Sequence, residues 1–154
     1  MEEYLTNQPM RTEDLEEYML SDPFIRQYYG GVVALDQLPI LFSKPRIYIV
    51  NSDPASEAGT HWYALYFDKI SEHFDSSGFK PISVLENHLV LHGPKYMYNN
   101  VRVQNFDTNS CGLFCLFYSY FRCRNYSFKD IMNMFSDNLQ LNENLVNYFY
   151  KLTV

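Results

Sequence analysis

Cysteine is scarce in this sequence. Its 154 residues contain only three cysteines, and all three follow residue 110. Three cysteines cannot build a disulfide framework, so we expect a reducing, intracellular compartment. Cys115 and Cys123 have no histidine at the spacing of zinc ligands, and we therefore expect no metal and no other cofactor.

Long apolar runs are missing as well. No stretch approaches about 18 consecutive apolar residues, which argues against a membrane span. The first residues, Met1-Glu-Glu-Tyr-Leu5, are acidic and lack the apolar segment of a signal peptide. We therefore expect no signal peptide and no contact with a membrane.

Positive charge is sparse, whereas apolar side chains are abundant. Twelve Lys and Arg residues stand against eighteen Asp and Glu residues, which gives a net charge of −6. No basic run is present to bind phosphates, so nucleic-acid binding is not indicated. The chain is 47% hydrophobic and 18% aromatic. These proportions and this length suit one core, and we expect a single monomeric domain over residues 1–154.

The spacing of apolar residues predicts a mixture of strands and helices. The expected strands cover residues 46–51, 61–67, about 70–75 and 96–104. The expected helices begin near residues 12, 23, 81, 111, 127 and 142, and Gly30-Gly31 should end the second of them. We therefore predict an α+β fold, in which a small, mixed, mainly antiparallel sheet packs against a central buried helix and flanking helices.

The central helix is expected to begin at Cys111. The polar loop Asn105–Ser110 precedes it and supplies Asn109 or Ser110 as the N-cap, and the segment that follows is apolar on every side. A thiol in the first turn of a helix has its anion stabilised by free backbone N–H groups and by the helix dipole, which favours a nucleophile. The alternative is an inert, buried cysteine, which is our interpretation of Cys115 one turn later.

Two neighbours of Cys111 suit a nucleophilic thiol. Gly112 has no side chain, so it can form an open part of the cleft wall beside the sulfur. Gln104, seven residues before Cys111, can direct a neutral amide donor to the same position.

A histidine and an acid can be brought together on neighbouring strands. If the turn after residue 67 is centred on Asp68, residues whose numbers sum to 136 face each other, and His61 lies opposite Asp75. Asp68 itself would lie about 23 Å along the strand from His61, because a strand rises roughly 3.3 Å per residue. The alternative for His61 is an edge-strand side chain packed against Trp62.

The remaining candidates have simpler interpretations. His73, His88 and His92 have no acid at comparable spacing, and we expect surface or partly buried side chains there. Asp107 suits either an orienting acid or a turn residue of its loop, and the turn is the simpler assignment.

Three short blocks of sequence fit this site and occur in a fixed order. They are Gly59-Thr-His-Trp-Tyr-Ala-Leu65, Phe74-Asp-Ser-Ser-Gly-Phe79 and Val103-Gln-Asn-Phe-Asp-Thr-Asn-Ser-Cys-Gly-Leu-Phe-Cys115. Together they resemble the motif blocks of the adenovirus protease (adenain) family, which is similar in turn to the SUMO-specific proteases. The seven-residue spacing from Gln104 to Cys111 matches the adenoviral pattern. An acid of the Asp type, by contrast, is the choice of the SUMO-protease branch.

The resemblance implies a papain-like, adenain-like cysteine proteinase fold and a role for each matching residue. His61 would be the general base, Asp75 would orient it, and Cys111 would be the nucleophile. The side-chain amide of Gln104 and the backbone N–H of Cys111 would form the oxyanion hole, and Trp62 would form a wall of the cleft.

The activity that follows from the resemblance is that of a cysteine endopeptidase, or thiol protease. It would hydrolyse peptide bonds beside small residues such as glycine and mature precursor proteins of a virus or a virus-like element. One alternative is a protease that removes SUMO or another ubiquitin-like modifier. Another is a protease-like binding module without turnover, although such a module would not require all four of His61, Asp75, Gln104 and Cys111.

The resemblance also suggests partners and a location. We expect protein or polypeptide substrates, and a host nucleus or a virion as the place of action. Adenoviral enzymes are activated by a viral peptide bonded to a cysteine upstream of the glutamine. No cysteine precedes Cys111 here, so an activating peptide would have to bind non-covalently. The acidic net charge argues against activation by DNA.

Overall fold

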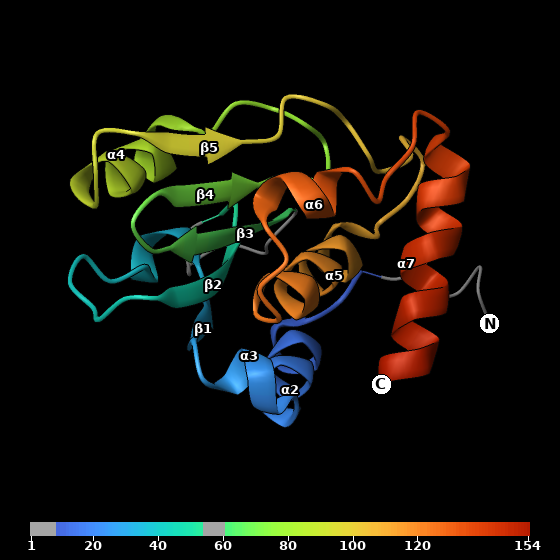
Figure 1. The fold of residues 1–154 in the computed structure, drawn as a ribbon, viewed down its shortest axis with the longest axis horizontal. Coiled ribbons are helices and arrows are strands. Elements are labelled where there is room, and N and C mark those ends of the chain that lie inside the picture. The colour runs from blue at the N-terminus through green and yellow to red at the C-terminus, as the bar shows by residue number, and fades with distance from the viewer. Residues whose placement is uncertain (1–8, 54–60) are drawn as a thin grey trace.

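A mixed five-stranded sheet forms the centre of a single small α+β domain, as expected (Figure 1). The computed structural model describes residues 9–53 and 61–154. The strands are β1 (Tyr29–Val33), β2 (Arg46–Asn51), β3 (Trp62–Phe67), β4 (Ser71–Phe74) and β5 (Tyr96–Tyr98), in that order across the sheet. The two inner pairs are antiparallel and the two outer pairs are parallel.

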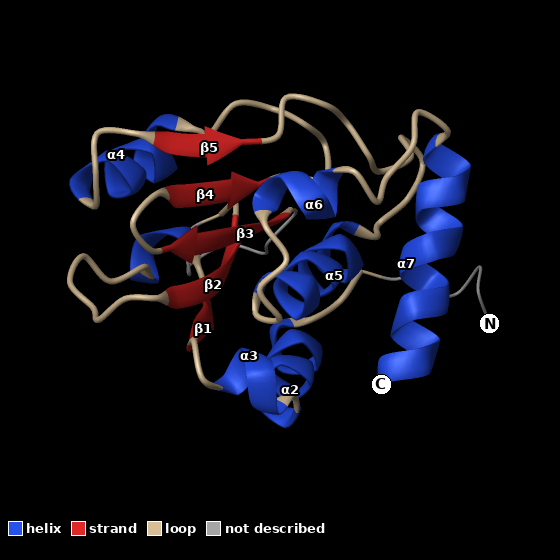
Figure 2. Cartoon of the chain, viewed as in Figure 1, coloured by secondary structure: helices blue, strands red, loops and turns tan. Residues whose placement is uncertain are grey.

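Helices cover both faces of this sheet. The helices are α2 (Thr12–Ser21), α3 (Pro23–Arg26), α4 (Ser83–Leu91), α5 (Cys111–Arg122), α6 (Phe128–Met132) and α7 (Leu139–Thr153). Figure 2 shows α4 on one side of the sheet and α2, α3, α5 and α6 on the other. Side chains of β3 alternate between the two faces, so both of its faces are buried.

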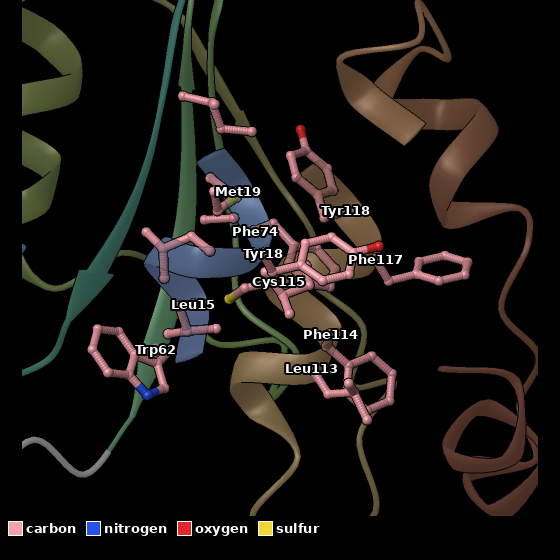
Figure 3. Packing of buried hydrophobic residues seen from close by; sticks show 14 of the residues in the cluster. Leu15, Tyr18, Met19, Trp62, Phe74, Leu113, Phe114, Cys115, Phe117 and Tyr118 are labelled. Carbon is pink, nitrogen blue, oxygen red and sulfur yellow. The ribbon is translucent and has the colours of Figure 1, made fainter. Parts of the chain in front are cut away.

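Helix α5 lies at the centre of the larger core. All residues from Cys111 to Ser119 are buried. Phe114, Phe117 and Tyr118 extend from α5 into the cluster shown in Figure 3, where they meet side chains of α2 and β4. A helix that is apolar on every side must be covered on every side, and this requirement holds the start of α5 in a fixed place against the sheet.

Two differences from the expected strands have local causes. Gly30-Gly31 does not end a helix but lies inside β1. A Cβ atom at Gly30 would come within 2.3 Å of the ring of Tyr48 on β2, so glycine is needed where that ring crosses the strand. The second difference concerns residues 99–104. Strand β5 ends at Tyr98, and the backbone N–H groups of Val103 and Gln104 both donate to the carbonyl of Ser76 in a turn.

The expected start of the last helix is wrong by one turn. Helix α7 begins at Leu139, and the side chain of Asn138 caps it by accepting a hydrogen bond from the backbone N–H of Leu141. Asn142, where the helix was expected to begin, is buried and donates through Nδ2 to the carbonyl of Val103 at 3.0 Å.

His73 differs from the surface or partly buried position expected for it. It is fully buried on β4, with its ring 5.2 Å from the ring of Tyr63. Burial lowers the pKa of His73 to about 4, so its ring is neutral at neutral pH. Among residues 9–53 and 61–154, no helix is long and apolar enough to cross a membrane.

Candidate active site

Cys111 is the first residue of α5 and lines a pocket of about 430 Å³. Ser110 occupies the N-cap position, as expected, but its hydroxyl does not cap the helix and donates to Glu143 instead. The Cys111 residue is 7% exposed. Because Cys111 is the first residue of α5, its sulfur lies beside the first turn, where backbone N–H groups without a partner in the helix and the positive end of the helix dipole stabilise an anion.

His61 and Asp75 meet at one end of the sheet. His61 comes directly before β3, Asp75 comes directly after β4, and their Nε2 and Oδ1 atoms are 2.6 Å apart. The Asp75 side chain is 3% exposed and also accepts a hydrogen bond from the backbone N–H of Ser77. The imidazole is thereby held at one nitrogen, and Nδ1 is the nitrogen left for Cys111.

The register that predicted this pair was wrong by two residues. Ala64 lies opposite Phe74 and Leu65 opposite His73, so facing residues sum to 138 rather than 136. A shift of two keeps every side chain on its face, whereas a shift of one would have separated His61 from Asp75. The two side chains meet as diagonal neighbours.

The electrostatics of His61 favour its protonated form. Burial lowers the pKa of the ring, but hydrogen bonds to Asp75 and to Cys111, together with the negative charges of both groups, outweigh burial and raise the pKa to about 9. At neutral pH the ring is therefore an imidazolium held between a carboxylate and the sulfur of Cys111. Such a ring stabilises a thiolate and has a proton to give.

Gln104 lines the same pocket as His61 and Cys111. Its backbone N–H donates to the carbonyl of Ser76 at 3.0 Å, and its Oε1 accepts from the hydroxyl of Ser76 at 2.5 Å. Its Nε2 donates to the carbonyl of Thr108 at 3.0 Å and to the Thr108 hydroxyl at 3.3 Å. The structure thus brings the amide to the pocket through the Ser76 turn rather than through a strand.

The two expected wall residues have different positions. Trp62 lines the pocket, and its Nε1 donates to the carbonyl of Met10 at 3.2 Å, which ties the segment before α2 to the pocket edge. Gly112 does not line the pocket. It is buried, and a Cβ atom there would lie 3.1 Å from the Cβ of Met10, so the glycine makes room for the segment that covers the helix start.

The other expected candidates do not join the site. Asp107 is exposed, and neither it nor Asp68 lines the pocket. Cys115 is fully buried, and burial raises its pKa well above the ordinary value. Cys123 is buried as well, which raises its pKa to about 12. In the described part of the chain, no three His, Cys, Asp or Glu residues are grouped to hold a metal ion.

Sequence reasoning missed the residues that support Asp75. Asn99 accepts from the backbone N–H of Asp75 through Oδ1 and donates to its carbonyl through Nδ2, at 2.9 and 2.5 Å. Gly78 has φ +77°, and a Cβ atom there would lie 2.5 Å from the backbone nitrogen of Arg102. The small-residue turn Ser76-Ser77-Gly78 was the available signal for Gly78. Asn99 had no such signal.

The sequence matches no protein-family model and no curated protein. Solved structures nevertheless share its fold. A crystal structure of ASFV pS273R protease is 14% identical, with a TM-score of 0.64 over 93% of this chain and 68% of that chain. In a selenomethionine form of the same protease, the match is 21% identical, with a TM-score of 0.50 over 66% of this chain and 43% of that chain.

A bacterial domain is similar as well. The central domain of the uncharacterized Lpg1148 protein from Legionella pneumophila is 13% identical, with a TM-score of 0.51, over 96% of this chain and 100% of that domain. At these identities the likeness concerns the fold. This chain spans 43% of the selenomethionine ASFV chain and 68% of the other.

Proposed function

We propose that this chain is a cysteine endopeptidase in which Cys111 is the nucleophile. The observation that carries the proposal is the His61 ring, which is hydrogen-bonded to the buried Asp75 at 2.6 Å and lines the same pocket as Cys111 at the start of α5. A core cysteine needs no such partners. The fold shared with the ASFV pS273R protease is consistent with this assignment.

The proposed reaction has two steps, and His61 moves the proton in both. The Cys111 thiolate attacks the carbonyl carbon of the peptide bond, and the His61 imidazolium gives its proton to the departing amine as the C–N bond breaks. A thioester remains. Water then attacks it while His61 accepts a proton from that water, and the C–S bond breaks to release the acid and restore the thiolate. Asp75 keeps the ring oriented throughout.

We further propose that Gln104 and the backbone N–H of Cys111 hold the oxyanion of each tetrahedral intermediate. The longer contact of the Gln104 amide, 3.3 Å to the Thr108 hydroxyl, is the one that an oxyanion would replace. Gln104→Ala is expected to lower kcat by about 10²–10³, as loss of one oxyanion donor does. Steady-state kinetics with a cleaved peptide measures this, and an unchanged kcat would assign the donor to another group.

The raised pKa of His61 predicts how activity depends on pH. Only the protonated ring can supply the leaving amine with a proton, and this form is lost as the pH rises through about 9. We therefore expect kcat/KM for peptide hydrolysis to fall above a pH of about 9. Alkylation of Cys111 needs no proton donor and should not fall there. A decline of hydrolysis that begins near pH 6.5, the ordinary value for histidine, would contradict the proposed pairing.

The proposed substrates are polypeptides cut beside small residues, with glycine foremost, and the proposed role is maturation of viral or virus-like precursor proteins. This finer assignment rests on the three motif blocks around His61, Asp75 and Cys111. A peptide library incubated with the purified protein tests it, and enrichment of glycine at the cleaved bond is expected. Cleavage of SUMO conjugates without cleavage of the peptides would favour a deconjugase. Rapid labelling of Cys111 with neither cleavage would contradict both substrate assignments.

A further inference from the structure

Helix α7 reaches the loop before Cys111 through one buried carboxylate. Glu143 is 1% exposed. Its Oε1 accepts from the hydroxyl of Ser110 at 2.7 Å, and its Oε2 accepts from the backbone N–H of Asn105 at 2.9 Å and from the hydroxyl of Thr108 at 3.2 Å. One side chain therefore binds the first, a middle and the last residue of the loop 105–110.

We propose that Glu143 is a positioning residue that fixes the oxyanion side of the active site. The proposal rests on the endopeptidase function proposed above and adds to it a residue about 30 positions beyond the nucleophile. Ser110 immediately precedes Cys111, whose backbone N–H is one proposed oxyanion donor. By holding Ser110, Glu143 fixes the peptide group that carries this donor.

The second oxyanion donor is connected to Glu143 through Thr108. The hydroxyl of Thr108 lies between Oε2 of Glu143 and Nε2 of Gln104, at 3.2 and 3.3 Å. The carbonyl of Thr108 accepts from the same Nε2 at 3.0 Å. A displaced Thr108 would therefore move the Gln104 amide. Both proposed donors thus depend on the position of one loop, and that loop is held by Glu143.

The chemistry of the contacts explains why a carboxylate occupies this position. A buried carboxylate is costly unless hydrogen bonds compensate for the lost water, and Glu143 has three donors from the loop. Its contact with Ser110 also places it at the positive end of the α5 dipole, which favours an anion. An apolar side chain would leave the backbone N–H of Asn105 without this acceptor, and the hydroxyls of Ser110 and Thr108 would keep only their contacts within the loop.

Neighbouring residues of α7 hold the flanks of the same segment. Gln140 accepts from the side-chain amide of Asn105 at 3.3 Å, and Asn142 donates to the carbonyl of Val103 at 3.0 Å. Asn142 is itself held by Ser136, because its Oδ1 accepts a hydrogen bond from the backbone N–H of Ser136 at 2.8 Å. The N-terminal half of α7 therefore serves as the support on which the segment 103–110 lies.

The variant Glu143→Gln separates positioning from general stability. Glutamine keeps the length of the side chain but has a single acceptor oxygen, and its NH2 group would face at least one donor of the loop. His61, Asp75 and the sulfur are untouched. A matched control is Asn147→Ala, which removes a buried polar side chain from the same helix one turn further on. Its Nδ2 donates to the backbone carbonyl of Glu143 at 2.8 Å rather than to the loop, so the variant leaves the Glu143 carboxylate and its three loop donors in place.

Two probes of the purified full chain give the decisive comparison. Iodoacetamide alkylates the Cys111 sulfur without forming an oxyanion. A peptide aldehyde that ends in glycinal adds to the same sulfur and forms a hemithioacetal, whose oxygen occupies the oxyanion hole. In Glu143→Gln we expect the Ki of the aldehyde to rise about 10- to 100-fold through misplaced donors, while the alkylation rate constant stays unchanged. Asn147→Ala should change neither the Ki of the aldehyde nor the alkylation rate constant, each expressed per molecule with a reactive Cys111.

The outcomes distinguish this inference from the function on which it rests. If the wild type binds the aldehyde and Glu143→Gln binds it equally well, per molecule with a reactive Cys111, the positioning role is overturned and the proposed endopeptidase function is kept. If the wild type shows neither rapid alkylation nor aldehyde binding, both proposals are overturned. Should Glu143→Gln fail to fold, Thr108→Val serves in its place, because it removes the hydroxyl by which Glu143 holds the residue whose carbonyl accepts from Gln104. The same split is then expected, and equal aldehyde binding overturns the role.

Discussion

Replacing Cys111 by alanine is expected to abolish peptide hydrolysis, with a loss in kcat on the order of 10⁶. The physical reason is that no other thiol can take over. Cys115 is fully buried within the core around α5, and Cys123 lies buried at the other end of the same helix with its pKa raised to about 12. The measurement is initial-rate kinetics with the best glycine-containing peptide from the library.

Cys123→Ala is the matched control for Cys111→Ala. It removes the thiol at the C-cap of the same helix but is expected to leave hydrolysis in place, because Cys123 does not line the pocket. Full activity of Cys111→Ala would exclude Cys111 as the nucleophile. Equal losses in both variants would attribute the effect to the packing of α5 rather than to chemistry.

Replacing His61 by alanine should cost nearly as much as removing the nucleophile, also on the order of 10⁶ in kcat. The ring accounts for both proton transfers in the proposed reaction, and its contact with Cys111 favours the thiolate. We expect hydrolysis to be lost while the protein stays folded, because the His61 ring is 22% exposed and lies at the edge of the pocket. Kinetics together with circular dichroism measures the two effects separately.

His88→Ala is the control for this variant. His88 belongs to α4, on the face of the sheet opposite α5, so its removal should leave kcat unchanged (Figure 2). A His61→Ala variant that is folded and hydrolyses peptides at the wild-type rate would exclude the proposed pair. Loss of activity in both variants would show that histidine replacement acts through the fold.

The central helix could be predicted from the sequence because its signal is unusually strong. Twelve residues that are apolar on almost every side permit only a buried position, and the polar loop before them fixes the start at Cys111. The meeting of His61 with Asp75 was predicted with the wrong register. The pair was still predicted correctly, because strand side chains alternate with a period of two. An error of two residues therefore left both side chains on the same face of the sheet.

Other parts of the site could not be read from local pattern. Asn138 and Asn142 are equally good caps by residue type, and the choice between them depends on Val103, which binds Asn142 from 39 positions away. From its place in the sequence pattern, Glu143 would be an ordinary polar residue of an amphipathic helix. Its burial is imposed by three donors of a loop more than 30 residues earlier. Such long-range polar contacts leave no periodic trace in the sequence.

The proposed peptidase activity depends above all on the activation of Cys111 by His61, and the pH dependence of alkylation tests this activation most directly. Iodoacetamide labelling of Cys111 would be followed by mass spectrometry from pH 5 to 9, with glutathione as the reference thiol. We predict that Cys111 reacts much faster than glutathione at pH 6, and that His61→Ala removes this advantage. Labelling that rises with pH in parallel with glutathione, in the wild type and in His61→Ala alike, would contradict the account.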